Sequence, residues 1–194
     1  MHCNAALAPL LLALAAGAAA PAGQAPPALP AHEPVMAAGP PAARAQAAGP
    51  ALQFQLPGSW VKETPSSSMR VAQAKIPGPA GPGQFAIFYF GPGGGGTPEA
   101  NIARWVGQID SPIRPPRRES FATHGLRVSW VEVAGTLKPS TVGMGPTTAQ
   151  PGSRLLGAVV EGAGGPWYVK AIGPDATIGA ARGSFLDLLR GLHP

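Results

Sequence analysis

Residues 84–110 read QFAIFYFGPGGGGTPEANIARWVGQID, and they carry the strongest structural signals in the chain. The opening run QFAIFYF is apolar on both faces, which predicts a central strand covered on both sides. The glycine-rich loop 91–96 follows. Thr97, Pro98 and Glu99 then suit a helix start, because threonine caps free backbone N–H groups and proline is tolerated at the first helical position. The stretch therefore predicts a buried strand, a loop and a helix.

The predicted helix has one apolar face. At about 100° per residue, four side chains share a stripe, namely Ile102, Trp105, Val106 and Ile109. The pattern continues to about Asp110, and prolines follow at positions 112, 115 and 116. We therefore expect a helix of about three turns that packs on the sheet through this stripe.

Further strands are predicted where short apolar or alternating runs end at Gly or Pro. They cover residues 52–56, 60–63, 69–76, 120–123, 126–137, 155–161 and 167–172. A last helix is predicted with Asp175 as its cap, and its apolar face consists of Ile178, Ala181, Phe185, Leu188, Leu189 and Leu192. Because strands joined by short turns pair antiparallel, the predicted fold class is α+β, an antiparallel β-sheet covered by two helices.

The chain of 194 residues divides by composition into three parts. Residues 1–20 contain an uncharged apolar run and small residues, which predicts a signal peptide; an alanine-rich start of a cytoplasmic protein is the alternative. Residues 21–50 contain 11 Ala, 8 Pro and 3 Gly, which predicts a disordered Ala/Pro-rich tether. All twelve aromatic residues lie beyond residue 51, so 51–194 is expected to form a single α+β domain. We therefore expect an exported protein, periplasmic or extracellular, with no transmembrane segment in the mature chain.

Composition argues against several classes of partner. A single cysteine, Cys3, excludes a disulfide framework and a thiolate zinc site, and four scattered histidines do not suggest a metal centre. The net charge of +5 is modest and lacks the clustering of a nucleic-acid-binding surface. The densest basic run, Arg114 to Arg118, favours a solvated connector over a lipid contact. We expect no metal, no cofactor and no nucleic-acid partner.

The residues needed for catalysis are not recognisable in the sequence. There is no G-x-S-x-G motif, and His124 is the only histidine inside the expected domain away from its end. The acidic residues form no spaced pair typical of glycoside or metal chemistry. The sequence therefore favours a protein that is not an enzyme.

A polar stripe beside the apolar face of the first helix is the strongest candidate site. Asn101, Arg104 and Gln108 follow one another at i, i+3 and i+7, and Arg70 is expected nearby on the sheet. An arginine fork flanked by amides suits a carboxylate of a ligand or partner. The alternative is that these residues bond to the sheet edge or to water, as polar helix flanks usually do.

The glycine-rich loop offers a second hypothesis. Gly91, Gly93 and Gly96 match G-x-G-x-x-G after a strand and before a helix, the context in which backbone N–H groups bind a pyrophosphate. Five glycines in six residues match many patterns, and the chain that follows lacks alternating β-α units. A flexible crossing loop is the alternative.

Four segments resemble a group of uncharacterised exported bacterial proteins. They are Phe54-x-x-Pro57-x-x-Trp60, Ser68-Met69-Arg70-x-Ala72, Phe88-Tyr89-Phe90-Gly91 and the 99–108 segment EANIARWVGQ. The element order is similar to the PsbP-like α-β-α sandwich fold, shared by the extrinsic PsbP protein of photosystem II and a small Ran-binding nuclear import factor. The resemblance implies a non-enzymatic accessory or binding module.

Two functional hypotheses follow. The first is an exported, non-enzymatic accessory or binding domain that contacts a protein or envelope component through Arg70, Asn101, Arg104 and Gln108 or through the sheet edge. The second is a small-ligand or nucleotide-binding protein, or an enzyme, that uses loop 91–96.

Overall fold

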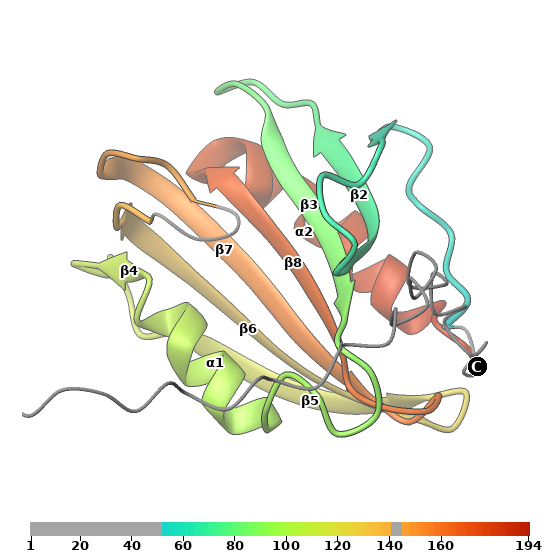
Figure 1. The fold of residues 1–194 in the computed structure, drawn as a ribbon. Helices are drawn as coiled ribbons and strands as arrows, with labels where there is room; N and C mark the ends of the chain where they lie inside the picture. The colour runs from blue at the N-terminus through green and yellow to red at the C-terminus, as the bar shows by residue number, and fades with distance from the viewer. Residues whose placement is uncertain (1–51, 141–144) are drawn as a thin grey trace, which may run out of the picture. The chain divides into compact units, whose positions relative to one another are not determined.

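An antiparallel β-sheet organises the described part of the chain, residues 52–140 and 145–194 of the computed structural model (Figure 1). The predicted signal peptide 1–20 and tether 21–50 lie outside the described residues. The strands in chain order are β1 (Val61–Glu63), β2 (Arg70–Ile76), β3 (Gly83–Tyr89), β4 (Ile109–Asp110), β5 (Arg117–Thr123), β6 (Leu126–Leu137), β7 (Gln150–Glu161) and β8 (Trp167–Pro174). Helix α1 (Pro98–Val106) lies between β3 and β4, and α2 (Asp175–Arg190) follows β8. The strand order across the sheet is β1-β2-β3-β8-β7-β6-β4, and β5 also pairs with β6.

The predicted fold class, a sheet covered by two helices as in a PsbP-like sandwich, is wrong. Eight antiparallel strands dominate the described residues, while the two helices have only 9 and 16 residues. Helix α1 packs mainly on β6 and β7, so it leaves that face of β2 and β3 without a helix. The sequence misled because it does not show the strand order, which spreads the sheet over eight strands, or that the short α1 packs mainly on β6 and β7.

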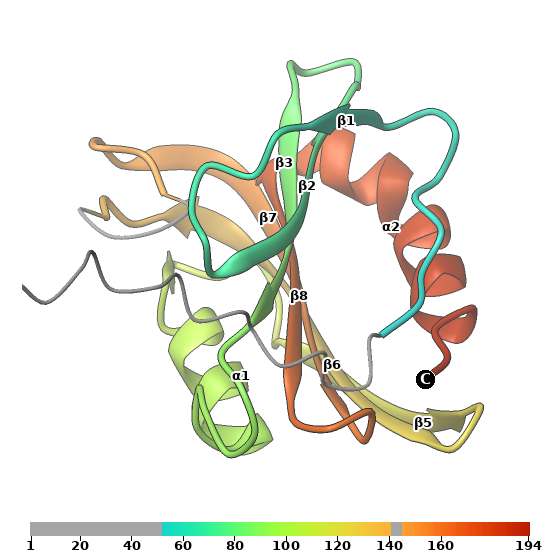
Figure 2. The same cartoon turned by 45° about the vertical axis from the view of Figure 1, so that its right-hand side comes forward.

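The two helices contact opposite faces of the sheet, which Figure 2 shows nearly edge-on. We call these the α1 face and the α2 face. The α2 face carries the larger core, and five of the six residues of the predicted apolar stripe are buried on α2, while Leu192 is buried beyond its end. The predicted Asp175 cap is wrong, because Asp175 is the first helical residue and Pro174 takes the N-cap position. The α1 face carries a smaller core around Ile102, Trp105 and Val159.

Helix α1 begins as the sequence predicts but ends earlier. The Thr97 hydroxyl accepts a hydrogen bond from the Ala100 backbone N–H, as an N-cap should. The helix ends at Val106 with Gly107 as its C-cap, and Ile109 then pairs with Leu137 in the sheet. The predicted continuation to Asp110 is wrong because β6 provides a strand partner for Ile109.

Three other predicted boundaries change by several residues. The strand expected over 120–123 begins earlier, at Arg117. The expected strand 52–56 is reduced to an isolated bridge between Gln53 and His193. The strand expected over 155–161 is longer, because β7 begins at Gln150 and pairs there with Leu137. The strands expected over 155–161 and 167–172 pair antiparallel across a short turn, as expected, and correspond to β7 and β8.

Candidate functional site

The predicted site residues lie on the α1 face of the sheet, beside α1. Strand register places side chains in rows across β2, β3 and β8. One row consists of Arg70, Phe88 and Tyr168, and the next of Gln73, Ala86 and Lys170. Because α1 packs mainly on β6 and β7, it does not cover the part of these rows that lies on β2.

Lys170 is a buried cation on β8. Its side chain is only 6% exposed, and its Nζ donates a hydrogen bond to Gln108 Oε1 at 2.7 Å. Burial, together with the positive charges of Arg104 and Arg70, lowers the pKa of Lys170 to about 8. Both arginines therefore lie close enough to Lys170 to act on its charge.

Arg104 is held by Asn101 from the preceding turn of α1. The Nη2 group of Arg104 donates to Asn101 Oδ1. Asn101 is 2% exposed, and its Nδ2 donates to the carbonyl oxygens of Gly95 and Thr97 at 2.8 and 2.9 Å. Since its amide is fully used by these bonds, Asn101 orients Arg104 and fixes the loop end.

Arg70 is held by Gln73 of the same strand. Its Nη1 donates to Gln73 Oε1 at 2.6 Å, and its Cζ lies 5.5 Å from the centre of the Phe88 ring. Gln73 Nε2 in turn donates to Glu63 Oε2 at 3.1 Å. Glu63 therefore does not bond to Arg70 directly, because the neutral amide of Gln73 lies between them.

Arg70, Arg104 and Lys170 share one pattern, and we call them the cation triad. A neutral amide oxygen orients each of them, and none forms an ion pair with any residue the structure describes. An amide accepts a hydrogen bond but does not cancel the charge of its donor. The triad is therefore a preorganised positive patch with the chemistry to bind an anion.

The glycine-rich loop presents its carbonyl groups to the protein. The hydroxyl of Tyr168 donates to the carbonyl oxygens of Gly94 and Gly96, at 3.0 and 2.8 Å. Burial raises the pKa of Tyr168, and nearby Glu161 adds to this rise while Arg104 opposes it. These bonds attach the loop to β8, which suits a crossing loop and gives the nucleotide-binding hypothesis no support.

The four predicted residues occupy two roles. Arg70 and Arg104 belong to the cation triad, whereas Asn101 and Gln108 position its members. The expected i, i+7 helical spacing of Gln108 is wrong, since Gln108 follows the end of α1. The sequence reasoning missed Lys170, although a lysine inside the apolar run WYVKAI of residues 167–172 is a recognisable signal.

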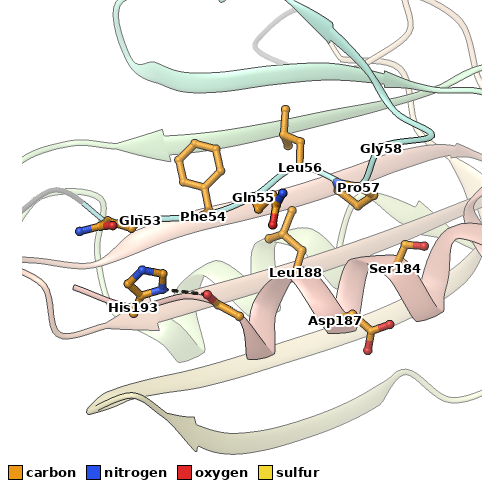
Figure 3. A pocket seen from close by; sticks show the side chains of 11 residues that line it. Gln53, Phe54, Gln55, Leu56, Pro57, Gly58, Ser184, Asp187, Leu188 and His193 are labelled. Carbon is orange, nitrogen blue, oxygen red and sulfur yellow. Dashed lines mark hydrogen bonds between the residues drawn. The ribbon is translucent and has the colours of Figure 1, made fainter.

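A groove of about 570 Å³ lies between residues 53–58 and α2 (Figure 3). It contains Ser184, Asp187 and His193, the residue types of a hydrolase triad. Asp187 pairs with Arg190, and His193 Nδ1 donates to the Gly191 carbonyl at 3.0 Å. Figure 3 shows His193 and Ser184 at opposite ends of the groove. The arrangement therefore does not assemble a nucleophile with a base.

In an ion-pair network on β6, β7 and α2, the arginines are neutralised by carboxylates of the same network. Glu132 accepts from both Arg154 and Arg182, and Arg154 Nε also lies 2.7 Å from Asp175 Oδ1. Burial alone lowers the pKa of Arg154, but the carboxylates of Asp175 and Glu132 raise it above its ordinary value. Because each arginine has a carboxylate, this network is a structural clamp and not an open anion site.

Two absences apply to residues 52–140 and 145–194. No three His, Cys, Asp or Glu side chains there are grouped so that they could hold a metal ion. Neither helix there has the length and apolar character to cross a membrane.

Comparison with known proteins identifies no family. No protein-family model matches the chain, and no curated protein matches it. Among solved structures, PA94, a protein of unknown function from Pseudomonas aeruginosa, is similar with a TM-score of 0.45 and 14% identity, over 71% of this chain and 98% of that chain. None of these comparisons bears on the resemblance to a group of uncharacterised exported bacterial proteins, which stays a prediction.

Proposed function

We propose that this protein is an exported, non-enzymatic binding domain that holds an anionic group of a partner protein or envelope component on the cation triad. The observation that carries the proposal is the orientation of Arg70, Arg104 and Lys170 by amide oxygens without a neutralising carboxylate. Keeping Lys170 charged while buried among arginines costs stability, and such a cost is typical of functional sites.

The anion is bound rather than transformed. Within the cation triad only Lys170, whose pKa is about 8, could act as a base, and the side chains that contact the triad are amides and an aromatic ring, which supply neither a nucleophile nor a second base. An arginine fork and an ammonium together match a carboxylate or phosphate. The partner therefore presents one of these groups to the open α1 face.

Export is proposed from the apolar run within residues 1–20. The test is fractionation of the host cell with the C-terminally tagged full chain, followed by mass determination of the mature N-terminus. Recovery of an unprocessed chain in the cytoplasmic fraction would contradict export.

The binding proposal is tested with two defined anions, inorganic phosphate and glutarate, titrated into the full-length protein and followed by NMR. We expect both to shift signals of Arg104 and Lys170 at millimolar concentration, and Lys170→Gln and Arg104→Gln to weaken binding at least tenfold. Arg190→Gln is the matched control, since that arginine is exposed on α2 and pairs with Asp187. Equal binding by all three variants, or no binding by the wild type, would refute the proposal.

A further inference from the structure

Strand β5 leaves one backbone edge open, and we propose that this edge binds an extended acidic segment of a partner protein by strand addition. The strand pairs with β6 on one side, and no other strand of the described residues pairs with it. This surface is distinct from the cation triad, so the inference does not depend on the function proposed above.

The turn between β5 and β6 determines which backbone groups of β5 point outward. His124 and Gly125 both have positive φ, 45° and 80°, as a two-residue type I′ turn requires. In such a hairpin the flanking residues, Thr123 and Leu126, exchange both backbone hydrogen bonds. Since the pattern alternates, the outward N–H and C=O groups belong to Arg118, Ser120 and Ala122.

These outward residues are accessible. Arg118, Ser120 and Ala122 are all exposed, and seven residues of β5 pair with β6 without an interruption of register. The opposite edge of the sheet is different, because β1 has only three residues. Short edge strands resist the addition of further strands, whereas a long regular edge invites it.

Charge selects an acidic segment. Arg117 pairs with Glu119 at 2.5 Å, but Arg118 and Arg114 form no ion pair with any described residue. Both are exposed at the N-terminal end of β5. A carboxylate beside Arg118 on an added strand would complete a cross-strand pair of opposite charges.

A second copy of this chain fits this edge less well. Antiparallel pairing of two β5 strands about Ser120 forms the same backbone bonds, but it places Arg118 opposite the partner's Ala122. The arginine then gains no carboxylate. The charge therefore favours an acidic partner segment over self-association.

The test uses the full-length protein and two acetylated peptides, four repeats of Thr-Glu and four repeats of Thr-Lys, followed by amide NMR shifts. We expect the Glu peptide to bind at least tenfold more tightly than the Lys peptide and to shift the amides of Arg118, Ser120 and Ala122. Ser120→Pro removes an outward N–H without removing a backbone bond to β6, and like Ser120→Ala it loses the hydroxyl contact with Ser129, so it should weaken binding at least tenfold while the alanine variant does not. Ser120→Ala is the matched control and should bind like the wild type.

A charge reversal keeps the test decisive if Ser120→Pro does not fold. Arg118→Glu should reverse the order of the two peptides, while Lys170→Gln should leave the preference for the Glu peptide unchanged. Binding that maps to the cation triad, equal affinity for both peptides, or no binding at millimolar concentration would overturn the inference. So would a dimer in sedimentation that Ser120→Pro abolishes, because the edge would then serve a second copy.

Discussion

The ammonium of Lys170 is buried in a central strand, close to two arginines and bonded to a neutral amide. Its pKa of about 8 lies below the ordinary value of 10.5, so the native state disfavours its charge. Below pH 8 both native and unfolded states are protonated, and the native state bears the full cost. Above pH 10.5 neither state is charged, and the cost is absent. The free energy of unfolding should therefore rise between pH 8 and 10.5 by roughly 3 kcal/mol from this group.

Lys170→Met should stabilise the protein at pH 7, because it removes a buried charge and keeps the side-chain volume. We expect a gain of about 1–3 kcal/mol after the loss of the hydrogen bond to Gln108, shrinking toward zero above pH 10.5. Urea unfolding at pH 7, 9 and 10.5 measures this difference. Lys62→Met, at an exposed position, is the control and should change stability by less than about 0.5 kcal/mol. A pH-independent loss of stability in Lys170→Met would contradict the assignment.

At single positions, the sequence predicts which residues carry charge better than it predicts which side chains they contact. The residue types at Arg70 and Arg104 identify cations near α1, and both belong to the site. Lys170 was not predicted, because periodicity marks its strand as apolar and cannot say which cations the register brings next to it. The amide partners Asn101 and Gln108 were predicted as ligand contacts, and their orienting role depends on geometry that only the fold supplies.

Among the elements, α1 depends on a close fit to the sheet. A Cβ atom built on Gly157 of β7 would lie 2.3 Å from Cε3 of Trp105, so only glycine leaves room for the ring. Trp105 is 6% exposed in this position. The indole of Trp105, packed against Gly157, therefore fixes the position of α1 on the sheet.

Trp105→Ala should lower the free energy of unfolding by about 3–5 kcal/mol, because a large buried side chain leaves a cavity. Guanidinium unfolding followed by far-UV circular dichroism measures the loss. Val71→Ala is the control at a site that is 44% exposed, where a change of about 0.5 kcal/mol or less is expected. A near-neutral Trp105→Ala would be inconsistent with the seating of α1 on β7.

Gly157→Ala should cost about 1–3 kcal/mol in the wild type, because the new methyl overlaps the indole. In the Trp105→Ala background the same substitution should cost less, since the ring is gone. A double-mutant cycle in the same unfolding assay measures the coupling. Strictly additive effects would show that the two residues do not touch.

The start of α1 was predictable and its end was not. Thr97 and Pro98 are local signals, and the cap forms as expected. The end depends on β6, which pairs with Ile109 from more than twenty residues away. Apolar periodicity continues through Ile109 in either conformation, so the sequence alone cannot separate the helix from the strand that follows it.

For the whole molecule, Glu132 connects three elements by accepting from Arg154 of β7 and Arg182 of α2. Glu132→Gln should lower the free energy of unfolding by about 1–3 kcal/mol, because two partly buried arginines lose their shared carboxylate. Thermal unfolding at pH 7 measures the effect. Glu119→Gln is the matched control, since its pair with Arg117 is 46–55% exposed and should contribute less than about 1 kcal/mol. Equal losses for both variants would argue against the clamp.

The sequence predicted the antiparallel sheet and most strands, but it misjudged the proportions of the molecule. Turn signals at Gly and Pro locate hairpins well, as in the pairing of β7 with β8. They do not show where a helix of 9 residues lies across the sheet, and α1 packs mainly on β6 and β7. The open α1 face over β2 and β3, and with it the site, follows from that placement.

The centre of the sheet joins segments made at very different times during synthesis. Strand β3 pairs on one side with β2, its neighbour in sequence, and on the other with β8, whose register joins Gln84 to Ile172. During synthesis, β8 must therefore be translated as far as Ile172 before it can pair along the whole free edge of β3. Such long-range closure slows folding and leaves the nascent chain exposed to aggregation, so a chaperone that shields β3 would act during this interval.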